Sequence, residues 1–200
     1  MARDKYGTGN DPYCYADSEV LCNILNIEDS AELENAESEL TELAALEIDF
    51  KPPPYDLRYL KAIHQQLFED LYEWAGELRS IDMTKGATRF CNCTRIKFEA
   101  DKQFRALSNA DNYVSYERNK LVEAIAALYI EINMLHPFRE GNGRAQRILF
   151  EHIVVNCGFE FELKDITQRE WTDANIAGVS CNYAPMTELF ERCIGGKFTE

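Results

Sequence analysis

The sequence predicts an all-α protein that carries one short β-hairpin. Apolar residues recur at helical spacing along most of the chain, and one segment places turn residues between two short extended runs. Hydrophobic residues make up 46% of the 200 residues, which is enough to fill the core of a single domain. No run of 18 apolar residues occurs, so we expect no membrane-spanning helix.

The first predicted helix lies in an acidic N-terminal region, residues 1–50. It begins at Asp29, because Asp29 and Glu32 match the spacing of a capping box. Apolar residues then follow with helical periodicity, at Leu33, Ala36, Leu40, Leu43 and Ala44. Thirteen acidic and two basic residues give this region a net charge of −11, out of −14 for the chain. We expect a helical layer packed on the core, whose charge is either a solvated face or a docking surface for a basic partner.

The core is predicted over residues 56–195. Lys51-Pro-Pro-Pro54 is incompatible with a helix, so residues 51–55 form a connector. A second amphipathic helix runs from Asp56 to Trp74 and is closed by Gly76. Further helices are predicted over residues 99–114, 119–135, 143–157, 168–177 and 185–193, before a tail at 196–200.

The predicted hairpin occupies residues 81–93. The runs LRSIDM and TRFC flank Thr84-Lys-Gly-Ala87, in which Gly86 supplies the special turn conformation. A hairpin at this place between two helices predicts a flap.

Charge and cysteine content exclude several classes of protein. An acidic balance argues against direct nucleic-acid binding, which depends on clustered Lys and Arg. Seven cysteines at irregular spacing do not form a disulfide framework, and the polar N-terminus has no apolar segment typical of a secretory signal. We therefore expect a reduced, cytoplasmic protein.

The segment HPFREGNGRAQR, residues 136–147, combines residue types suited to phosphate chemistry. Pro137 ends the preceding helix, so His136 is held at a helix–loop junction, and Phe138 can anchor the loop in the core. The run Gly141-Asn142-Gly143 permits positive φ angles, which turn backbone N–H groups into a concave anion site at the start of the next helix.

Charged side chains complete this site. Arg144 and Arg147 lie one helical turn apart, and two guanidinium groups suit a ligand with more than one phosphate. Glu140 beside phosphates implies a bridging hard cation, which we expect to be Mg²⁺. His136 suits a base that accepts a proton from a hydroxyl. Together these residues predict transfer of a nucleotide phosphate group to an incoming hydroxyl.

The same twelve residues resemble the H-x-F-x-[DE]-G-N-G-R-x-x-R motif of the Fic family at every specified position. The layout of residues 55–195 is similar to that family as well. The resemblance implies the Fic fold, a helical bundle with its flap over the active site. It also implies ATP as co-substrate, Mg²⁺, and transfer of AMP to a Tyr, Ser or Thr hydroxyl of a target protein.

Residue roles follow from the resemblance. His136 would activate the target hydroxyl, Phe138 would anchor the motif, and Glu140 would hold the Mg²⁺. Gly141, Asn142 and Gly143 would cradle the α- and β-phosphates, with Arg144 on the β-phosphate and Arg147 on the γ-phosphate. The phosphotransferase branch of the family departs from the motif at the positions of Gly143 and Arg144, and this chain does not. The resemblance therefore implies transfer of AMP.

The flap and the adenine pocket are less directly marked. Thr88, Arg89 and Phe90 are candidates for holding a target segment along the flap edge, and an ordinary packed hairpin is the alternative. Asn175 and Tyr183 are candidates for the adenine pocket from their order along the chain, with helix-capping and core roles as alternatives.

Regulation is suggested by a second pattern. Fic proteins are commonly restrained by an inhibitory helix with the pattern [ST]-x-x-x-E-[GN], and here Ser30, Glu34 and Asn35 match it. Glu34 would then restrain Arg147. Since Glu34 lies about 100° from the apolar stripe of its helix, a coincidental match is favoured. A separate small antitoxin that supplies the inhibitory helix is the alternative.

Taken together, these features predict a compact bacterial toxin that resembles the Fic family. The resemblance suggests type II topoisomerases as its targets. Two other functions remain open. One is a nucleotide-binding regulatory module without turnover, and the other is an enzyme of the same fold that transfers a different phosphate-containing group.

Overall fold

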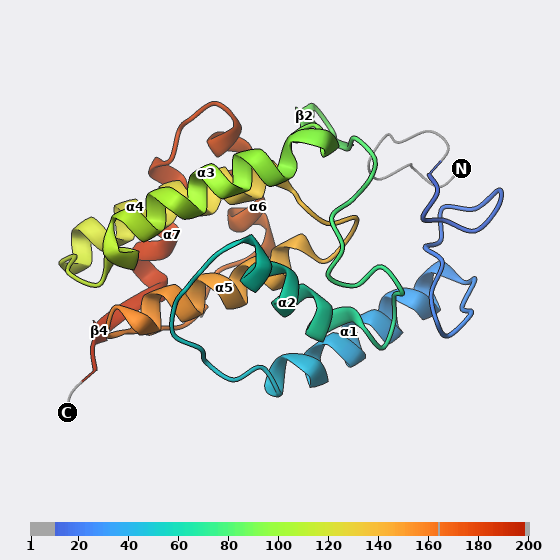
Figure 1. The fold of residues 1–200 in the computed structure, drawn as a ribbon, viewed down its shortest axis with the longest axis horizontal. Helices are drawn as coiled ribbons and strands as arrows, with labels where there is room; N and C mark the ends of the chain where they lie inside the picture. Colours follow the sequence, from blue (N-terminus) through green and yellow to red (C-terminus); the bar gives the residue numbers. More distant parts are fainter. Residues whose placement is uncertain (1–10, 164, 199–200) are drawn as a thin grey trace.

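The computed structural model describes residues 11–163 and 165–198, and within them the protein is mostly helical (Figure 1). The helices are α1 (Ser30–Leu46), α2 (Leu57–Phe68), α3 (Ile96–Asn109), α4 (Arg118–Leu135), α5 (Asn142–Asn156), α6 (Gln168–Val179) and α7 (Ala184–Cys193). The strands are β1 (Thr84–Lys85), β2 (Thr88–Arg89), β3 (Phe159–Phe161) and β4 (Ile194–Lys197). The predicted all-α class with a hairpin flap is confirmed. Residues 1–10 of the predicted acidic layer and 199–200 of the predicted tail lie outside the described residues.

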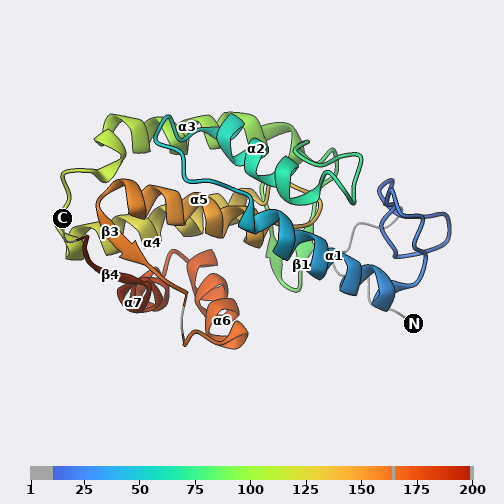
Figure 2. The ribbon, with the colours of Figure 1, turned by 90° about the horizontal axis from the view of Figure 1, so that it is seen from below.

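Helices α4 and α5 form the centre of the fold. Helix α5 packs between α2 and α4, and α4 also contacts α3, α6 and α7. Figure 2 shows α6 and α7 on the side of this pair opposite α2 and α3. Helix α1 packs on α2 and so forms an outer layer on the core.

Helix α4 is buried on most of its faces, as its apolar sequence predicts. Its buried side chains include Leu121, Val122, Ile125, Ala126, Leu128, Tyr129, Ile130, Ile132 and Leu135. A helix surrounded in this way has a position fixed by packing on several sides. The residue that follows it, His136, is therefore delivered to a well-defined place.

Helix α2 is shorter than its apolar pattern predicts. It ends at Phe68, and the amides of Leu71 and Tyr72 both donate to the Phe68 carbonyl as the chain turns. Leu71 matches the helical spacing and is buried, but it lies in the turn that follows α2. The prediction from periodicity alone was therefore too long at this end. Gly76 closes this turn at a φ of +78°.

Helix α1 begins after Asp29, whose carboxylate accepts from the amides of Ala31 and Glu32. Its inner face differs from the predicted stripe, because Leu43 is 63% exposed while Thr41 is buried. The Thr41 hydroxyl satisfies its own polarity by donating to the Glu37 carbonyl.

Strands β3 and β4 were not predicted. They pair antiparallel, Phe159 with Lys197 and Phe161 with Ile194, so the predicted boundary between core and tail falls inside β4. Helix α3 also differs from its predicted range, since it begins at Ile96 and ends at Asn109 before a short 3₁₀ turn. Within the described ranges, no helix is both long and apolar enough to cross a membrane.

Candidate active site

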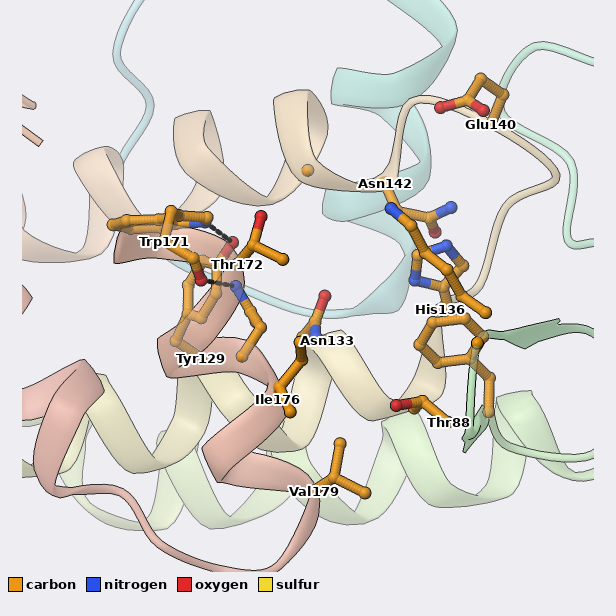
Figure 3. A pocket seen from close by; sticks show the side chains of 15 residues that line it. Thr88, Tyr129, Asn133, His136, Glu140, Asn142, Trp171, Thr172, Ile176 and Val179 are labelled. Atoms are coloured by element: carbon orange, nitrogen blue, oxygen red, sulfur yellow. Dashed lines mark hydrogen bonds between the residues drawn. The ribbon is translucent and has the colours of Figure 1, made fainter. Parts of the chain in front are cut away.

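The candidate active site is a cavity of about 400 Å³ between the flap, the motif and α6 (Figure 3). His136, Glu140, Asn142 and Gly143 line it from the motif. Its remaining walls come from the flap, α4 and α6, at Lys85, Gly86, Thr88, Phe90, Tyr129, Asn133, Trp171, Thr172, Asn175, Ile176 and Val179. The structure therefore joins the motif to segments that are distant in the sequence, from Lys85, 51 residues before His136, to Val179, 32 residues after Arg147.

His136 ends α4 in the left-handed conformation, with φ 44° and ψ 61°. Its imidazole stacks on the Phe90 ring at 3.9 Å between centroids and 9° between planes. Burial lowers the pKa of His136 to about 3, against an opposing effect of the Glu140 carboxylate. The imidazole is therefore neutral at physiological pH, which is the state that accepts a proton.

The Asn142 side chain holds the motif loop closed. Its Oδ1 accepts from the Phe138 amide and its Nδ2 donates to the Phe138 carbonyl, both at 2.8 Å. Phe138 is fully buried and stacks on His64 at 3.8 Å, as expected for an anchor. The Asn142 side chain is therefore engaged in the loop itself, while its backbone amide lies at the start of α5.

His64 supports the same loop from α2. Its Nδ1 accepts from the Gly76 amide at 2.9 Å, so Nε2 carries the proton and donates to the Glu140 carbonyl at 3.0 Å. Burial lowers the pKa of His64 to about 4, so this tautomer persists at neutral pH.

The start of α5 is the place at which the sequence predicts an anion site. Ala145 is the first amide to bond within the helix, to the Gly141 carbonyl at 3.1 Å. The amides of residues 142–144 precede that bond, so they and the helix dipole favour an anion at this end. Gly141 has a φ of +77°, and a Cβ there would lie 2.2 Å from the Phe68 ring. At Gly143, by contrast, a Cβ would meet nothing within 4 Å, so neither backbone nor packing requires a glycine.

Glu140 lies at the edge of the cavity, and its Oε1 accepts from the Gly141 amide at 3.0 Å. No cluster of three or more His, Cys, Asp or Glu able to hold a metal exists in the described part of the chain. One carboxylate beside an anion site fits Mg²⁺, which takes one or two protein carboxylates and completes its shell with substrate phosphates and water.

Arg144 and Arg147, the two arginines predicted to bind phosphates, point to different surroundings. Arg144 is bonded to the Glu37 carboxylate and, at 3.2 Å, to the Thr41 hydroxyl of α1, and its guanidinium lies 4.8 Å from the Phe68 ring centroid. Glu37 also accepts from the Tyr72 hydroxyl. Arg147 is exposed, and its Nε donates to the Gly143 carbonyl at 3.2 Å. Neither arginine lines the cavity.

The predicted inhibitory pattern does not reach these arginines. Ser30 begins α1, and Glu34 and Asn35 are exposed. Within residues 11–163 and 165–198, the Glu34 carboxylate has neither an ion pair nor a hydrogen bond, and the α1 carboxylate that meets the motif is that of Glu37. Restraint of Arg147 by Glu34 stays a prediction that these contacts do not support.

The three flap candidates lie in different environments. Thr88 lines the cavity, and Arg89 is exposed with a guanidinium 3.7 Å from the Asp82 carboxylate. Phe90 also lines the cavity, where its buried ring stacks on His136, and the target-holding role predicted for it stays a prediction. Strands β1 and β2 pair Thr84 with Arg89 and Lys85 with Thr88.

One of the two adenine-pocket candidates lines the cavity. Asn175 does so, with its Nδ2 donating to the Trp171 carbonyl and its buried Oδ1 without a hydrogen bond among the described residues. Tyr183 does not, because its hydroxyl donates to Glu131 at 2.7 Å outside the cavity. The aromatic wall is instead Trp171 with Tyr129, joined by a 3.1 Å hydrogen bond (Figure 3).

Sequence reasoning missed the residues that hold the motif from a distance. Arg79, His64 and Glu37 each contact it from another part of the chain. The motif's own Arg139 forms a buried ion pair with Asp11, at 2.6 Å. No local pattern marks these residues, because their roles depend on contacts that only the fold creates.

Comparison with known proteins agrees with the motif. The model of the Fic/DOC family matches residues 54–154, about half of the chain, including the whole motif. A protein of Escherichia coli (strain K12) named "Probable protein adenylyltransferase Fic" is 37% identical, over 96% of each chain. "Protein adenylyltransferase VbhT" of Bartonella schoenbuchensis is 32% identical over 94% of this chain and 40% of its own length.

Solved structures give the same answer. The crystal structure of BepC from Bartonella tribocorum with bound AMPPNP has a TM-score of 0.86 and 26% identity, covering 93% of this chain and 97% of BepC. An N-terminal Fic domain from Bartonella quintana with bound ADP has a TM-score of 0.85 and 27% identity, covering 92% of this chain and 95% of that domain. The chain therefore belongs to the Fic/DOC family, and its enzyme class is that of the protein adenylyltransferases.

Proposed function

We propose that this protein transfers AMP from ATP to a Tyr, Ser or Thr hydroxyl of a target protein. The observation that carries the proposal is the meeting of two features in one cavity. A buried, neutral imidazole, that of His136, faces the same space as the open amide end of α5. One suits a hydroxyl nucleophile and the other suits the phosphates that it attacks.

The bond changes follow from these positions. His136 accepts the proton of the target hydroxyl as its oxygen attacks the α-phosphorus of ATP. A new oxygen–phosphorus bond forms, the bond to the bridging oxygen of the β-phosphate breaks, and pyrophosphate leaves. The amides of residues 142–144 stabilise the charge that develops on the phosphate oxygens, because they are fixed before the reaction begins.

Mg²⁺ would be held by Glu140 at the edge of the phosphate site, where it would neutralise part of the charge of ATP. The two arginines would bind the outer phosphates, with Arg144 on the β- and Arg147 on the γ-phosphate. Arg147 is exposed, and among the described residues its side chain is engaged only by a carbonyl of its own helix, so it has freedom to turn to a ligand. On binding ATP, the Arg144 guanidinium would either replace its bond to Glu37 with one to the β-phosphate or bond to both groups at once.

The wall from α6 would receive the base of the nucleotide. Trp171 and Tyr129 provide aromatic surface, and Ile176 and Val179 provide apolar surface at the same end of the cavity (Figure 3). The buried Oδ1 of Asn175 is an acceptor suited to the amino group of adenine. BepC with AMPPNP supports an adenine nucleotide as the ligand of this fold.

The biological setting is proposed from the family resemblance. The protein would act in the cytoplasm as a bacterial toxin, with a type II topoisomerase as its target. An extended target segment would add to the flap, where Arg89 is exposed and Thr88 faces the cavity. The seven free thiols favour a reducing compartment.

A small antitoxin would supply the restraint. Helix α1 carries six glutamates from Glu32 to its C-cap Glu47 and no basic residue, and Leu43 and Leu46 are exposed on it. A partner helix with basic and apolar residues would complement that surface. Its inhibitory glutamate would then meet Arg147, which Glu34 does not contact.

The position of the label in ATP tests the proposal. The purified protein is incubated with Mg²⁺ and ATP labelled at the α- or the γ-phosphate, with a bacterial lysate or a purified type II topoisomerase as acceptor. AMP transfer labels protein from α-labelled ATP alone. Label from γ-labelled ATP alone would show transfer of a phosphoryl group instead. ATP binding without any labelled protein would leave a regulatory module and contradict the proposal.

Gly143 offers a separate test of the phosphate site. Gly143→Ala should leave the free energy of unfolding unchanged or raise it by up to about 1 kcal/mol, because alanine favours a helix and its Cβ meets no protein atom. The same methyl group would occupy phosphate space, so the affinity for ATP should fall about tenfold or more, or ~1.4 kcal/mol. Calorimetric titration with an ATP analogue and denaturant unfolding measure the two effects.

Gly196→Ala is the matched control. Gly196 lies in β4, away from the cavity, and a Cβ there also meets nothing within 4 Å. That variant should bind nucleotide as the unmodified protein does. Unchanged affinity in Gly143→Ala would mean that no ligand approaches the start of α5.

A further inference from the structure

Arg79 is a buried cation in the segment between Gly76 and the flap. Its residue is 2% exposed, and burial lowers the pKa of its guanidinium from the usual range. A charge in such a place is costly unless its hydrogen bonds are satisfied. Arg79 has no role in the proposed transfer of AMP, so the groups that satisfy its charge indicate what else it does.

All the hydrogen bonds of the guanidinium within the described residues go to backbone carbonyls. Nε donates to the His136 carbonyl at 2.7 Å and one Nη donates to the Leu135 carbonyl at 3.2 Å. The two Nη atoms also donate to the carbonyls of Ile81 and Cys91, one at each base of the flap. The side chain thus binds three separate segments at once: the end of α4 and both legs of the flap.

Backbone contacts reinforce the same junction. The Arg79 amide donates to the Pro137 carbonyl, and the Cys91 amide donates to the Met134 carbonyl, both at 2.9 Å. The carbonyls at the end of α4 have no partner within the helix and carry its negative dipole end, so a cation is favoured there. The bonded carbonyl of His136 belongs to the residue whose imidazole lies in the cavity.

We propose that Arg79 is a positioning residue, which locks the flap onto the end of α4 and so fixes the imidazole of His136 relative to a target segment on the flap. Phe90 lies between the two parts, two residues from Thr88 and stacked on His136. A shift of either flap leg would therefore move the stacked ring, the imidazole, or both. This inference rests on the proposed role of His136 as the base.

The position of His136 matters because proton transfer requires hydrogen-bond reach between base and hydroxyl. A misplacement of about 1 Å can cost on the order of 100-fold in rate. Nucleotide binding should be less sensitive, because α5 and α6 hold their cavity residues without contact to Arg79. The predicted consequence is a loss of turnover with retained nucleotide affinity.

The test compares Arg79→Met and Arg79→Lys with the unmodified protein. At saturating ATP, the rate of labelling from α-labelled ATP should fall about 100-fold in Arg79→Met. Arg79→Lys keeps the charge but has a single nitrogen, which reaches fewer of the carbonyls, so its rate should lie between the other two. The dissociation constant of an ATP analogue should change by less than about threefold in both.

Amide hydrogen exchange measures directly how firmly the flap is held to the end of α4. The Cys91 amide should exchange at least about tenfold faster in Arg79→Met, while the amides within α5 keep their protection. This measurement needs no turnover, so it tests the lock even if AMP transfer is not found. Absence of labelling by the unmodified protein would count against the proposed function alone.

Arg118 provides the matched control. It also donates to carbonyls at a helix end, that of Glu191 in the last turn of α7 and those of Ile194 and Gly195 just after it. It does not line the cavity, and it lies beside the Glu191 carboxylate. Arg118→Met should lower stability without changing the rate of labelling of the folded protein. The inference would be overturned if Arg79→Met labelled protein at the rate of the unmodified protein and its Cys91 amide exchanged at the unmodified rate. It would also be overturned if both Arg79 variants lost nucleotide binding and turnover equally.

Discussion

Replacing His136 with alanine is expected to lower the rate of AMP transfer at saturating ATP by roughly 10²–10⁴-fold, the range that a general base contributes. The reason is the place of its imidazole, which is neutral at physiological pH and lines the cavity beside the start of α5. Labelling from α-labelled ATP measures the rate. The affinity for an ATP analogue should be retained, because the amide end of α5 is unchanged.

His152→Ala is a suitable control for this prediction. His152 is also buried, with a pKa lowered by burial, but it bonds to the Tyr59 hydroxyl from the middle of α5 and does not line the cavity. Its replacement should affect stability and leave the turnover of the folded protein unchanged. A His136→Ala enzyme with nearly full rate would show that another group takes the proton.

The second large effect is expected at Gly141. Gly141→Ala should lower the free energy of unfolding by about 2–6 kcal/mol, since left-handed strain and overpacking each cost about 1–3 kcal/mol. Its Cβ would lie 2.2 Å from the Phe68 ring, which is fully buried and has little room to move. Denaturant unfolding measures the loss, and nucleotide affinity should fall with it because the start of α5 must shift.

Two further variants separate the causes. Gly86→Ala carries a similar positive φ of +58° in the flap, but its Cβ would meet nothing within 4 Å, so it should show the backbone strain alone. Phe68→Leu combined with Gly141→Ala should recover part of the loss, since the shorter side chain removes the clashing ring atoms. Equal effects of Gly141→Ala and Gly86→Ala would contradict the clash with Phe68.

The sequence allowed the motif and most helices to be predicted because their information is local. The run from His136 to Arg147 is continuous, so spacing alone could indicate a base, an anchor and an anion site on one loop. Helix α4 matched its predicted range within one residue because its apolar pattern ends at a proline. Where a pattern continued into a turn, as at Leu71, the helix was predicted too long.

The rest depends on contacts between distant residues. Strand β4 contains Gly195 and Gly196, which disfavour a strand, and it exists because β3 offers a partner. The bond between Glu37 and Arg144 spans 107 positions, and no periodicity links them. The inhibitory pattern at Ser30 shows that a local match alone can mislead. Its glutamate, Glu34, lies on the exposed face of α1, whereas Glu37, one turn later, forms the ion pair with Arg144 of the motif.

The ion pair between Asp11 and Arg139 has a consequence for the order in which the protein is made. The two residues are 128 positions apart, and both side chains are more than nine-tenths buried. On a ribosome that adds about 5–20 residues per second, the N-terminal segment therefore waits many seconds for its partner. Contacts of such long separation form late, after the entropy of closing the intervening chain has been lost. The catalytic loop is thus completed only after residue 139 has emerged, and the cavity only after α6 has followed, so a polypeptide that ends before α6 carries no assembled active site.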